Sequence, residues 1–379
     1  MDLAQFRALV PLTRQRSYFF AGAISPATQP VLAASQRYLA ALRDEPLSPY
    51  QSWPRDLEEL RRGFAALIGA PAAQVAITDN TSRASALAIR LLDRIDPAGA
   101  VVVDDTTYPS SIYTWLTHGR HEIRPVATRS AASSEEAAAA IAAAVDDSVL
   151  AVVVSHVCPL TGFRHDLQAL AGALRGSRAL LMVDAAQSLG VVPVDVARDG
   201  VDVLVATSMK WLLGMPGIGY LYLAPEVEQL APALDVGYAG LADQGARWPR
   251  AQLPPAVVGA ARFECGIPAL GAIPAATAGL GVIADVGVPA IAGQVTQLVT
   301  HVLGVLRGHG LRPVTPEDER MRAGVVAAYL DGADDLAAAL ARRGVDVGGY
   351  PWGLLRIDPH AYCSDDDIQR LDGALGEVL

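Results

Sequence analysis

The stretch VLVATSMKWLLGMPGIGYLYL, residues 203–223, places a lysine between two apolar runs typical of β-strands. Lys210 is the only lysine among 379 residues, and the other 29 of the 30 Lys and Arg residues are arginines. A guanidinium stays charged, whereas a desolvated lysine amine can lose its proton and act as a nucleophile or a base. The retention of one lysine therefore predicts a chemical role for Lys210; the alternative is a remaining surface charge.

Short apolar runs alternate with longer segments rich in Ala, Leu and Arg on both sides of this stretch. Runs of this kind separated by helical patterns predict a mostly parallel sheet with helices on both faces. Good helix formers predict a surface helix in the Ala-rich segment 133–147. The expected strands are residues 74–78, 100–104, 149–155, 179–184, 202–206 and 217–223.

The character of the sequence changes between about residues 235 and 262, where turn residues are frequent and periodicity is absent. We expect a long ordered loop there, and such loops are often functional. The sequence after this loop predicts a smaller α+β unit whose last helix begins with an N-cap residue. Its expected elements are a helical stretch (270–308), a strand (325–330), a helix (335–344), a strand (353–358) and a helix (364–375).

Composition limits the function classes. The net charge of −10 and the pI near 5.2 argue against a nucleic-acid partner. The first residues lack a secretory-signal pattern, and we expect no membrane span, so a cytoplasmic location is predicted. The three cysteines form no CxxC pair, so neither a disulfide nor a structural zinc site is expected.

A strand is expected to end at Asp184, with Gln187 on the first turn of a following helix. Ligands of open α/β sheets bind at the carboxyl ends of the strands. A carboxylate at such an end suits the ring nitrogen of pyridoxal 5'-phosphate (PLP), a cofactor held by a lysine Schiff base. The alternative for Asp184 is a helix N-cap.

Residues Asn80, Thr81 and Ser82 stand between an expected strand and an expected helix, and Asn80 is the only asparagine. Backbone N–H groups and hydroxyls at a helix N-terminus make an anion site suited to a phosphate. Ordinary helix capping is the alternative.

Four segments together resemble class V aminotransferases and cysteine desulfurases, which are PLP enzymes of fold type I. They are YFFAGAISPATQPVL (18–32), VDAAQSLG (183–190) with the lysine stretch, RFECGIPALGAI (262–273) and LLRIDPHAYCSDDDIQRL (354–371). The resemblance covers nearly the whole chain. It implies an α/β fold with a mostly parallel, seven-stranded-type sheet sandwiched by helices, plus a smaller α+β C-terminal domain.

The resemblance also implies a domain division and an assembly. Residues 17–260 would form the large PLP-binding domain, and residues 1–16 and 261–379 the small one. The enzyme would be a homodimer acting on a small amino-acid substrate, with segment 235–270 reaching the neighbouring subunit. No nucleic acid and no membrane would take part.

Each expected site residue has a role by this resemblance. Lys210 would form the Schiff base and move a proton at the substrate α-carbon, and Tyr108 would stack on the ring. Arg356 would grip the substrate carboxylate, its alternative being a surface arginine on an edge strand. The remaining cofactor contacts would be Asp184 to the pyridinium, Gln187 near the phenolic oxygen, and Thr81, Ser82, Thr207 and Asn80 at the phosphate.

Three positions depart from the family pattern. Met209 replaces the usual histidine before the lysine, Pro159 stands where an asparagine is frequent, and Ile267 replaces a threonine that reaches the phosphate of the neighbouring subunit. Each departure removes one expected polar contact to the cofactor.

Cysteine desulfurases carry a nucleophilic cysteine on a loop before the substrate arginine, and residues 344–358 contain none. Cys363 follows Arg356, and a structural role is expected for it. By the resemblance Cys158 would lie near the cofactor, where packing is its expected role. A persulfide relay is therefore disfavoured. We expect a lyase that cleaves a Cβ bond of the C–S type. Residues 344–358 and 315–324 resemble kynureninase, and residues 108–116 and 209–214 resemble the isopenicillin N epimerase-like and lyase branches.

A class V aminotransferase is the main alternative, and an epimerase, which needs a second acid, is another. A regulator or an inactive scaffold is disfavoured, because no DNA-binding domain is evident and the only lysine is retained. Specificity is expected in segments 43–57, 235–250 and 345–355.

Overall fold

The computed structural model describes residues 1–230, 237–242 and 254–379. Residues 235, 236 and 243–253 of the loop predicted at 235–262 lie outside the described residues, and so does most of the specificity segment predicted at 235–250.

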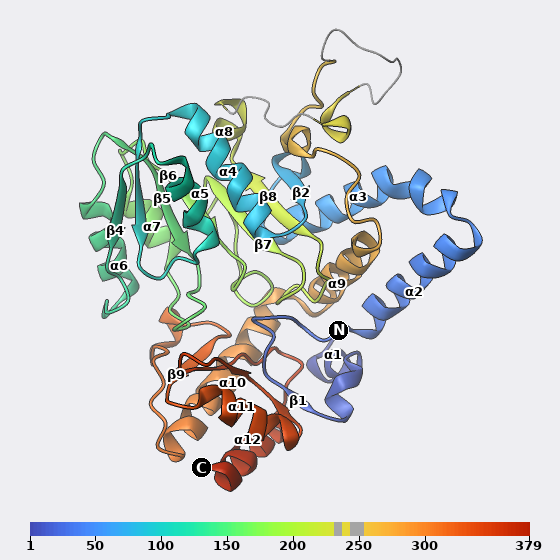
Figure 1. Cartoon of the computed structure of the whole chain (residues 1–379), viewed down its shortest axis with the longest axis vertical. Coiled ribbons are helices and arrows are strands. Elements are labelled where there is room, and N and C mark those ends of the chain that lie inside the picture. Colours follow the sequence, from blue (N-terminus) through green and yellow to red (C-terminus); the bar gives the residue numbers. More distant parts are fainter. Residues whose placement is uncertain (231–236, 243–253) are drawn as a thin grey trace.

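A seven-stranded sheet forms the centre of the larger part of the molecule (Figure 1), in the order β2-β8-β7-β6-β5-β3-β4. The neighbours from β7 to β4 pair in parallel, whereas β8 is antiparallel to both β7 and β2. The predicted mostly parallel α/β sheet is confirmed. The strands are β2 (Val75–Thr78), β3 (Ala100–Asp104), β4 (Ile123–Val126), β5 (Val149–Ser155), β6 (Leu180–Asp184), β7 (Val203–Thr207) and β8 (Gly219–Leu223).

Every residue of β3, β5, β7 and β8 is buried, which explains the uninterrupted apolar runs of these strands. The flanking helices of this part are α2 (Gln29–Asp44), α3 (Leu47–Leu67), α4 (Thr81–Ile95), α5 (Ser110–His118), α6 (Ser134–Ala143), α7 (Leu167–Ala173), α8 (Pro225–Leu230) and α9 (Ala272–Val286).

Two local predictions differ from the structure. Strand β4 was not predicted from the sequence. It is an edge strand that contains Pro125, and its residues are half-exposed or exposed, so it lacks an apolar run. The helix expected after Asp184 was wrong, and residues 186–188 form a turn. The physical reason is that Ala185 N–H still donates to Val205 O at 2.9 Å, so pairing with β7 continues past the end of β6.

The C-terminal part is the expected smaller α+β unit (Figure 1), in which β12 lies between β11 and β9. The N-terminal residues join it, because β1 pairs in parallel with β10 and Phe6 lies in its core. The domain boundaries stated above remain a prediction. The elements are α1 (Leu3–Ala8), β1 (Ser17–Tyr18), α10 (Val288–Gly308), β9 (Val326–Tyr329), α11 (Ala333–Arg342), β10 (Val345–Asp346), β11 (Gly348–Gly349), β12 (Leu354–Ile357) and α12 (Asp365–Val378).

Helix α10 is long and apolar enough, by length and composition, to cross a membrane. Its apolar side chains have another explanation, because they pack in the core of the C-terminal unit beside α12. This helix is therefore weak support for a membrane span. The buried residues are Ile291, Val295, Leu298, Val299, Val302, Leu303 and Leu306.

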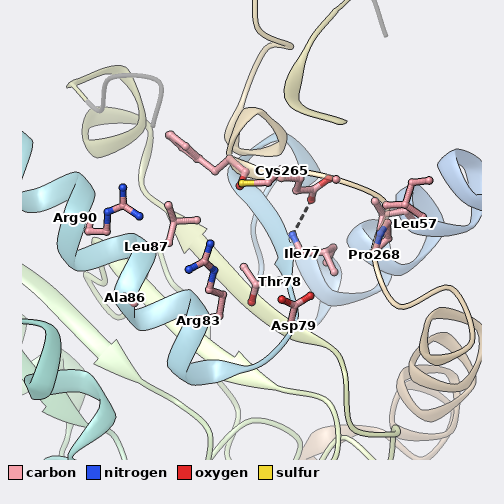
Figure 2. Close-up of a pocket in the computed structure, with 14 residues that line it drawn as sticks. Leu57, Ile77, Thr78, Asp79, Arg83, Ala86, Leu87, Arg90, Cys265 and Pro268 are labelled. Atoms are coloured by element: carbon pink, nitrogen blue, oxygen red, sulfur yellow. Dashed lines mark hydrogen bonds between the residues drawn. The ribbon is translucent and has the colours of Figure 1, made fainter. Parts of the chain in front are cut away.

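A buried ion pair ties α3 to the segment that follows residue 260. Arg61 Nη1 lies 2.6 Å from Glu264 Oε1, and both side chains are less than a tenth exposed. Glu264 Oε1 also accepts a hydrogen bond from Ile77 N–H of β2 at 2.7 Å, dashed in Figure 2. The carboxylate therefore fixes the 260s segment at one wall of a surface cavity whose opposite side carries Arg83 of α4.

We expect Glu264→Ala to lower the free energy of unfolding by about 3–5 kcal/mol, because it removes the only buried carboxylate that pairs with the buried Arg61 guanidinium among the described residues. Glu58→Ala is the matched control. It removes a half-exposed carboxylate that contacts the same guanidinium, with Arg61 Nε 2.9 Å from Glu58 Oε2, and should cost at most about 1 kcal/mol. Denaturant titration measures both values, and equal losses in the two variants would contradict the assignment.

Candidate active site

A cavity of about 330 Å³ opens at the carboxyl ends of three neighbouring parallel strands. Ser155, Asp184 and Thr207, the last residues of β5, β6 and β7, all line it. This is the place where open α/β sheets bind ligands. The structure brings every predicted site residue to this cavity: Asn80, Thr81, Ser82, Tyr108, Asp184, Gln187, Thr207, Lys210 and Arg356.

Asp184 is buried and held by two hydrogen bonds. Its Oδ1 accepts from Ala186 N–H at 3.0 Å, and its Oδ2 accepts from the Ser111 hydroxyl at 3.0 Å. Burial raises the pKa of Asp184, and the nearby Lys210 ammonium opposes that shift. A cationic group bound against this carboxylate would keep it ionised. The helix N-cap alternative is excluded, because no helix follows Asp184.

Lys210 follows β7 and projects into the cavity. Its Nζ lies 5.9 Å from the centroid of the Tyr108 ring, and no described residue hydrogen-bonds to it. Burial lowers the pKa of the amine, Asp184 raises it and Arg356 lowers it again. The lowered pKa means that a larger fraction of the amine is neutral here than in water, and the neutral form is the one needed for nucleophilic or base chemistry.

The backbone after Lys210 is strained. Leu213 is the only non-glycine residue with a positive φ, 61°, in the described parts of the chain, and its N–H donates to Lys210 O at 3.0 Å. Nearby Gly190 is required, because a Cβ there would lie 2.6 Å from Trp211 O at a φ of 94°. Such strain persists only where the surroundings fix the chain, so the lysine stands on a rigid turn.

The N-terminus of α4 forms another wall of the cavity. Asn80 caps the helix by accepting a hydrogen bond from Arg83 N–H at 2.9 Å, as the capping alternative predicted. The N–H groups of Thr81 and Ser82 have no acceptor among the described residues, and the Thr81, Ser82 and Thr207 side chains line the same space. This arrangement of donors suits a phosphate dianion.

Gln187 is held more firmly than the sequence suggested. Its Nε2 donates to Gly22 O at 2.9 Å, and its Oε1 accepts from Trp211 Nε1 at 2.8 Å. The amide thus ties the N-terminal segment to the chain after Lys210. One N–H of the amide remains for a ligand in the cavity.

Arg356 lies on the central strand of the three-stranded sheet and is only 5% exposed, so the surface edge-strand alternative is wrong. Its Nη2 lies 2.5 Å from Asp358 Oδ2, whereas its Nε has no hydrogen-bond partner among the described residues. Burial raises the pKa of Asp358 to about 6, and the Arg356 guanidinium opposes that shift. Asp358 orients the guanidinium whose other side lines the cavity.

Several residues at this site were not predicted from the sequence, namely Gly22, Ser111, Ser155, Tyr350 and Asp358. Ser155 carried a usable signal, since it ends an expected strand in the way that Asp184 does. Its Oγ accepts from Tyr108 N–H at 2.9 Å and so places the aromatic residue. Ser111 and Asp358 carried no such signal, because their contacts depend on how α5 and β12 pack.

The departures from the family pattern divide between two cavities. Met209 and Pro159 line the cavity described above. Ile267 is 46% exposed and lines the separate cavity of Figure 2 beside Pro268. No cysteine is among the residues that line the cavity with Lys210. Cys158 is buried between Val157 and Pro159, which do line it, Cys363 is buried in the C-terminal core, and Cys265 lines the second cavity.

Comparisons with known proteins agree with this geometry. The family model described as Aminotransferase class-V matches residues 17–349. The chain belongs to the class-V aminotransferase family. Class-V relatives include the uncharacterized aminotransferase YcbU of Bacillus subtilis (strain 168), 27% identical over 97% of this chain and 95% of that protein. Kynureninase of Pseudomonas fluorescens is 28% identical over 78% of this chain and 72% of that protein.

Solved structures confirm the fold of this class-V chain. The cystine C-S lyase C-DES, solved in complex with its reaction product cysteine persulfide, superposes with a TM-score of 0.87 at 20% identity, covering 97% of this chain and 99% of that chain. Probable cysteine desulfurases and an isopenicillin N epimerase are also among the relatives. The predicted fold type I is confirmed, and the chain is a PLP-dependent enzyme of the class-V family.

Proposed function

We propose that this enzyme cleaves a Cβ–S bond of a cysteine-like or otherwise β-substituted amino acid, with Lys210 as acid and base. The observation that carries the proposal is the composition of the cavity. A lysine with a lowered pKa, a buried carboxylate and an oriented arginine face one space that no thiol lines. The C-S lyase named above supports the same reaction class.

The residues fit PLP at its phosphate and at its ring nitrogen. The open N–H groups of Thr81 and Ser82, with the Thr207 hydroxyl, would hold the phosphate. Asp184 would hold the protonated ring nitrogen, because its pKa is raised by burial and a cation there restores its charge. Bound PLP would supply an electron sink that stabilises negative charge at the substrate α-carbon.

The remaining side chains would position the substrate and cofactor. Arg356 would bind the substrate carboxylate through the nitrogens that Asp358 leaves free. Tyr108 would cover the ring face, since its backbone N–H is fixed by Ser155. Gln187 would offer its remaining N–H to the phenolic oxygen.

Lys210 would take the proton from the substrate α-carbon. The electron pair of that C–H bond then forms the Cα–Cβ double bond, and the Cβ–S pair leaves with the sulfur. The sulfur leaving group takes up a proton, which Lys210 is placed to return. The released enamine hydrolyses to pyruvate and ammonia, so the elimination needs no oxidant and no second substrate other than water.

The positions of the thiols argue against a persulfide relay. Burial raises the pKa of the Cys158 thiol and of the Cys363 thiol, which disfavours the nucleophilic thiolate. Cys265 is exposed, but it lies at the cavity of Figure 2 and not at Lys210.

A variant with Cys158, Cys265 and Cys363 all replaced by Ala is expected to keep the wild-type rate within about threefold, a factor worth less than about 1 kcal/mol. The rate is measured as pyruvate and sulfide released from cysteine, cystine and other β-substituted amino acids. The bound cofactor's visible absorbance checks the folding of the variant. Loss of sulfide release with cofactor still bound would identify a persulfide enzyme instead, and alanine as the product would do the same.

Transamination is the second candidate, supported by the relative named as an aminotransferase. It would need the same proton transfers by Lys210 but a keto acid to complete each cycle. Epimerisation would need a second acid on the opposite face of the substrate.

We also propose that the enzyme is a cytoplasmic homodimer. The α2 and α3 helices extend from the rest of the molecule (Figure 1) and expose Leu39, Leu47 and Tyr50 by 63%, 68% and 51%. Apolar groups so exposed favour burial against a second copy. Sedimentation of the holoenzyme as a monomer at micromolar concentration would contradict the dimer.

A further inference from the structure

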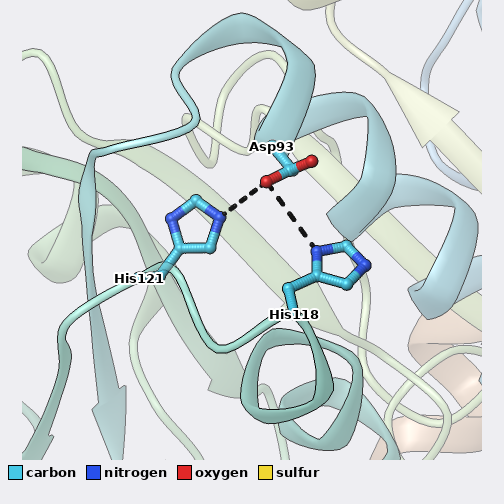
Figure 3. Close-up of side chains that lie close together, drawn as sticks. All are labelled: Asp93, His118 and His121. Atoms are coloured by element: carbon cyan, nitrogen blue, oxygen red, sulfur yellow. Dashed lines mark hydrogen bonds and ion pairs between the residues drawn. The ribbon is translucent and has the colours of Figure 1, made fainter.

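A cluster of two histidines and one aspartate lies away from the active-site cavity (Figure 3). Asp93 of α4 faces His118, the last residue of α5, and His121 in the connection to β4. Asp93 Oδ1 is 3.0 Å from His121 Nε2 and 3.8 Å from His118 Nδ1, and the three atoms lie within 4.8 Å of one another. Ligand atoms of a tetrahedral zinc site with bonds near 2.0–2.1 Å are about 3.3 Å apart, so these separations bracket a zinc geometry.

The hydrogen bonding of His121 leaves a lone pair directed at the aspartate. Its Nδ1 lies 2.8 Å from Gly99 O, a carbonyl that only accepts, so Nδ1 carries the proton. In the neutral His121 ring, Nε2 then carries a lone pair and no proton. This lone pair faces the Asp93 carboxylate, which is also a hydrogen-bond acceptor. A cation, either a proton or a metal ion, must lie between them. Histidines that ligate metals commonly donate their other N–H to a backbone carbonyl in this way.

His118 favours the metal ion over the proton. Its Nδ1 is buried and has no hydrogen-bond partner among the described residues, although it points at the same Asp93 oxygen. One proton on His121 would satisfy a single nitrogen. A metal ion would satisfy both nitrogens and the carboxylate oxygen together.

The surroundings of the cluster fix the carboxylate and also limit the affinity. Arg120 Nη2 donates to Asp93 Oδ2 at 2.7 Å, which leaves Oδ1 for the cluster. Arg90, Arg94 and Arg120 line the adjoining surface cavity, and their positive charge weakens cation binding. Two imidazoles favour zinc over magnesium or calcium, which prefer all-oxygen sites.

We propose that Asp93, His118 and His121 bind one Zn²⁺ ion, with the fourth position open to the adjoining cavity. The ion would join the end of α4 to the end of α5. The opposite ends of these helices carry Thr81 and Ser111, which serve the active-site cavity. The site would be independent of the reaction proposed for Lys210, although no metal was expected from the sequence.

The test measures zinc bound by PLP-loaded, tag-free enzyme after chelator treatment and dialysis against defined Zn²⁺. His118→Gln removes one ligand, and His309→Gln is the matched control. His309 also contacts an aspartate, with Nε2 2.8 Å from Asp372 Oδ1, and its side chain is 21% exposed, against 20% for His118. Any zinc that binds to PLP itself adds the same background to the zinc measured for the wild type and for both variants.

The expected result is one tightly bound zinc per chain in the wild type and in His309→Gln. His118→Gln should bind at least about tenfold more weakly. Zinc should also raise the thermal midpoint of the wild type and of His309→Gln, but not that of His118→Gln.

Wild-type protein with no zinc above the PLP background, or His118→Gln with wild-type zinc affinity, would overturn the proposal. The cluster would then be a His121–Asp93 ion pair. If His118→Gln does not fold, X-ray absorption spectroscopy of the zinc-loaded wild type identifies the zinc ligands instead. Two imidazole nitrogens and a carboxylate oxygen at about 2.0–2.2 Å support the site, and fewer than two imidazoles overturn it.

Discussion

Lys210→Arg is expected to lower kcat by about 10³-fold, because a guanidinium neither forms the covalent link to PLP nor exchanges a proton at neutral pH. The substitution keeps the positive charge beside Asp184, so a purely electrostatic role would survive it. The measurement is kcat for the best substrate of the panel, with bound PLP quantified in parallel.

Reductive trapping of the cofactor gives this prediction a second readout. Lys210 is the only lysine, so borohydride-fixed PLP on a lysine peptide of the wild type has one assignment. The label should be absent from the corresponding peptide of Lys210→Arg. A variant that keeps more than a tenth of wild-type kcat with PLP bound would exclude Lys210 as the proton-transfer group.

Asp184→Asn is expected to lower kcat by about 10–100-fold with little change in KM, because a charge-assisted hydrogen bond worth about 1.5–3 kcal/mol is lost. The amide has the shape of the carboxylate but cannot hold the ring nitrogen protonated. The substitution would therefore weaken the ability of the cofactor ring to accept electrons and would leave substrate binding unchanged.

Ser111→Ala provides the control for Asp184. It removes only the hydroxyl that donates to Asp184 Oδ2 at 3.0 Å, so the carboxylate and its charge stay in place. We expect kcat to fall at most about tenfold, as for the loss of one neutral hydrogen bond. Equal losses in the two variants, or a loss in Asp184→Asn confined to KM, would contradict the role given to the carboxylate.

The sheet could be predicted where strands are buried on both faces. β3 and β5 have the predicted bounds, because short uninterrupted valine-rich runs are typical of parallel strands buried on both faces. β4 could not be found in this way, since an edge strand needs no apolar run and tolerates Pro125.

The site was predictable where chemistry restricts the residue type. Lys210, Asp184 and the Asn80–Thr81–Ser82 turn stand at strand ends or a helix start, so sequence order alone brings them to one edge of the sheet. The Arg356–Asp358 pair and the Asp93–His118–His121 cluster depend on tertiary packing. No periodicity or spacing considered in the sequence pointed to those contacts.

The most direct test of the proposed elimination counts turnovers in the absence of any keto acid. Stoichiometric PLP enzyme is mixed with excess cysteine or cystine, and pyruvate is measured per enzyme chain while the visible absorbance of the cofactor is followed. The account predicts many pyruvate molecules per chain, sulfur release at the same rate, and a cofactor spectrum that recovers unaided. Formation of at most one keto acid per chain, with a bleached spectrum restored only by added keto acid, would contradict elimination and establish transamination.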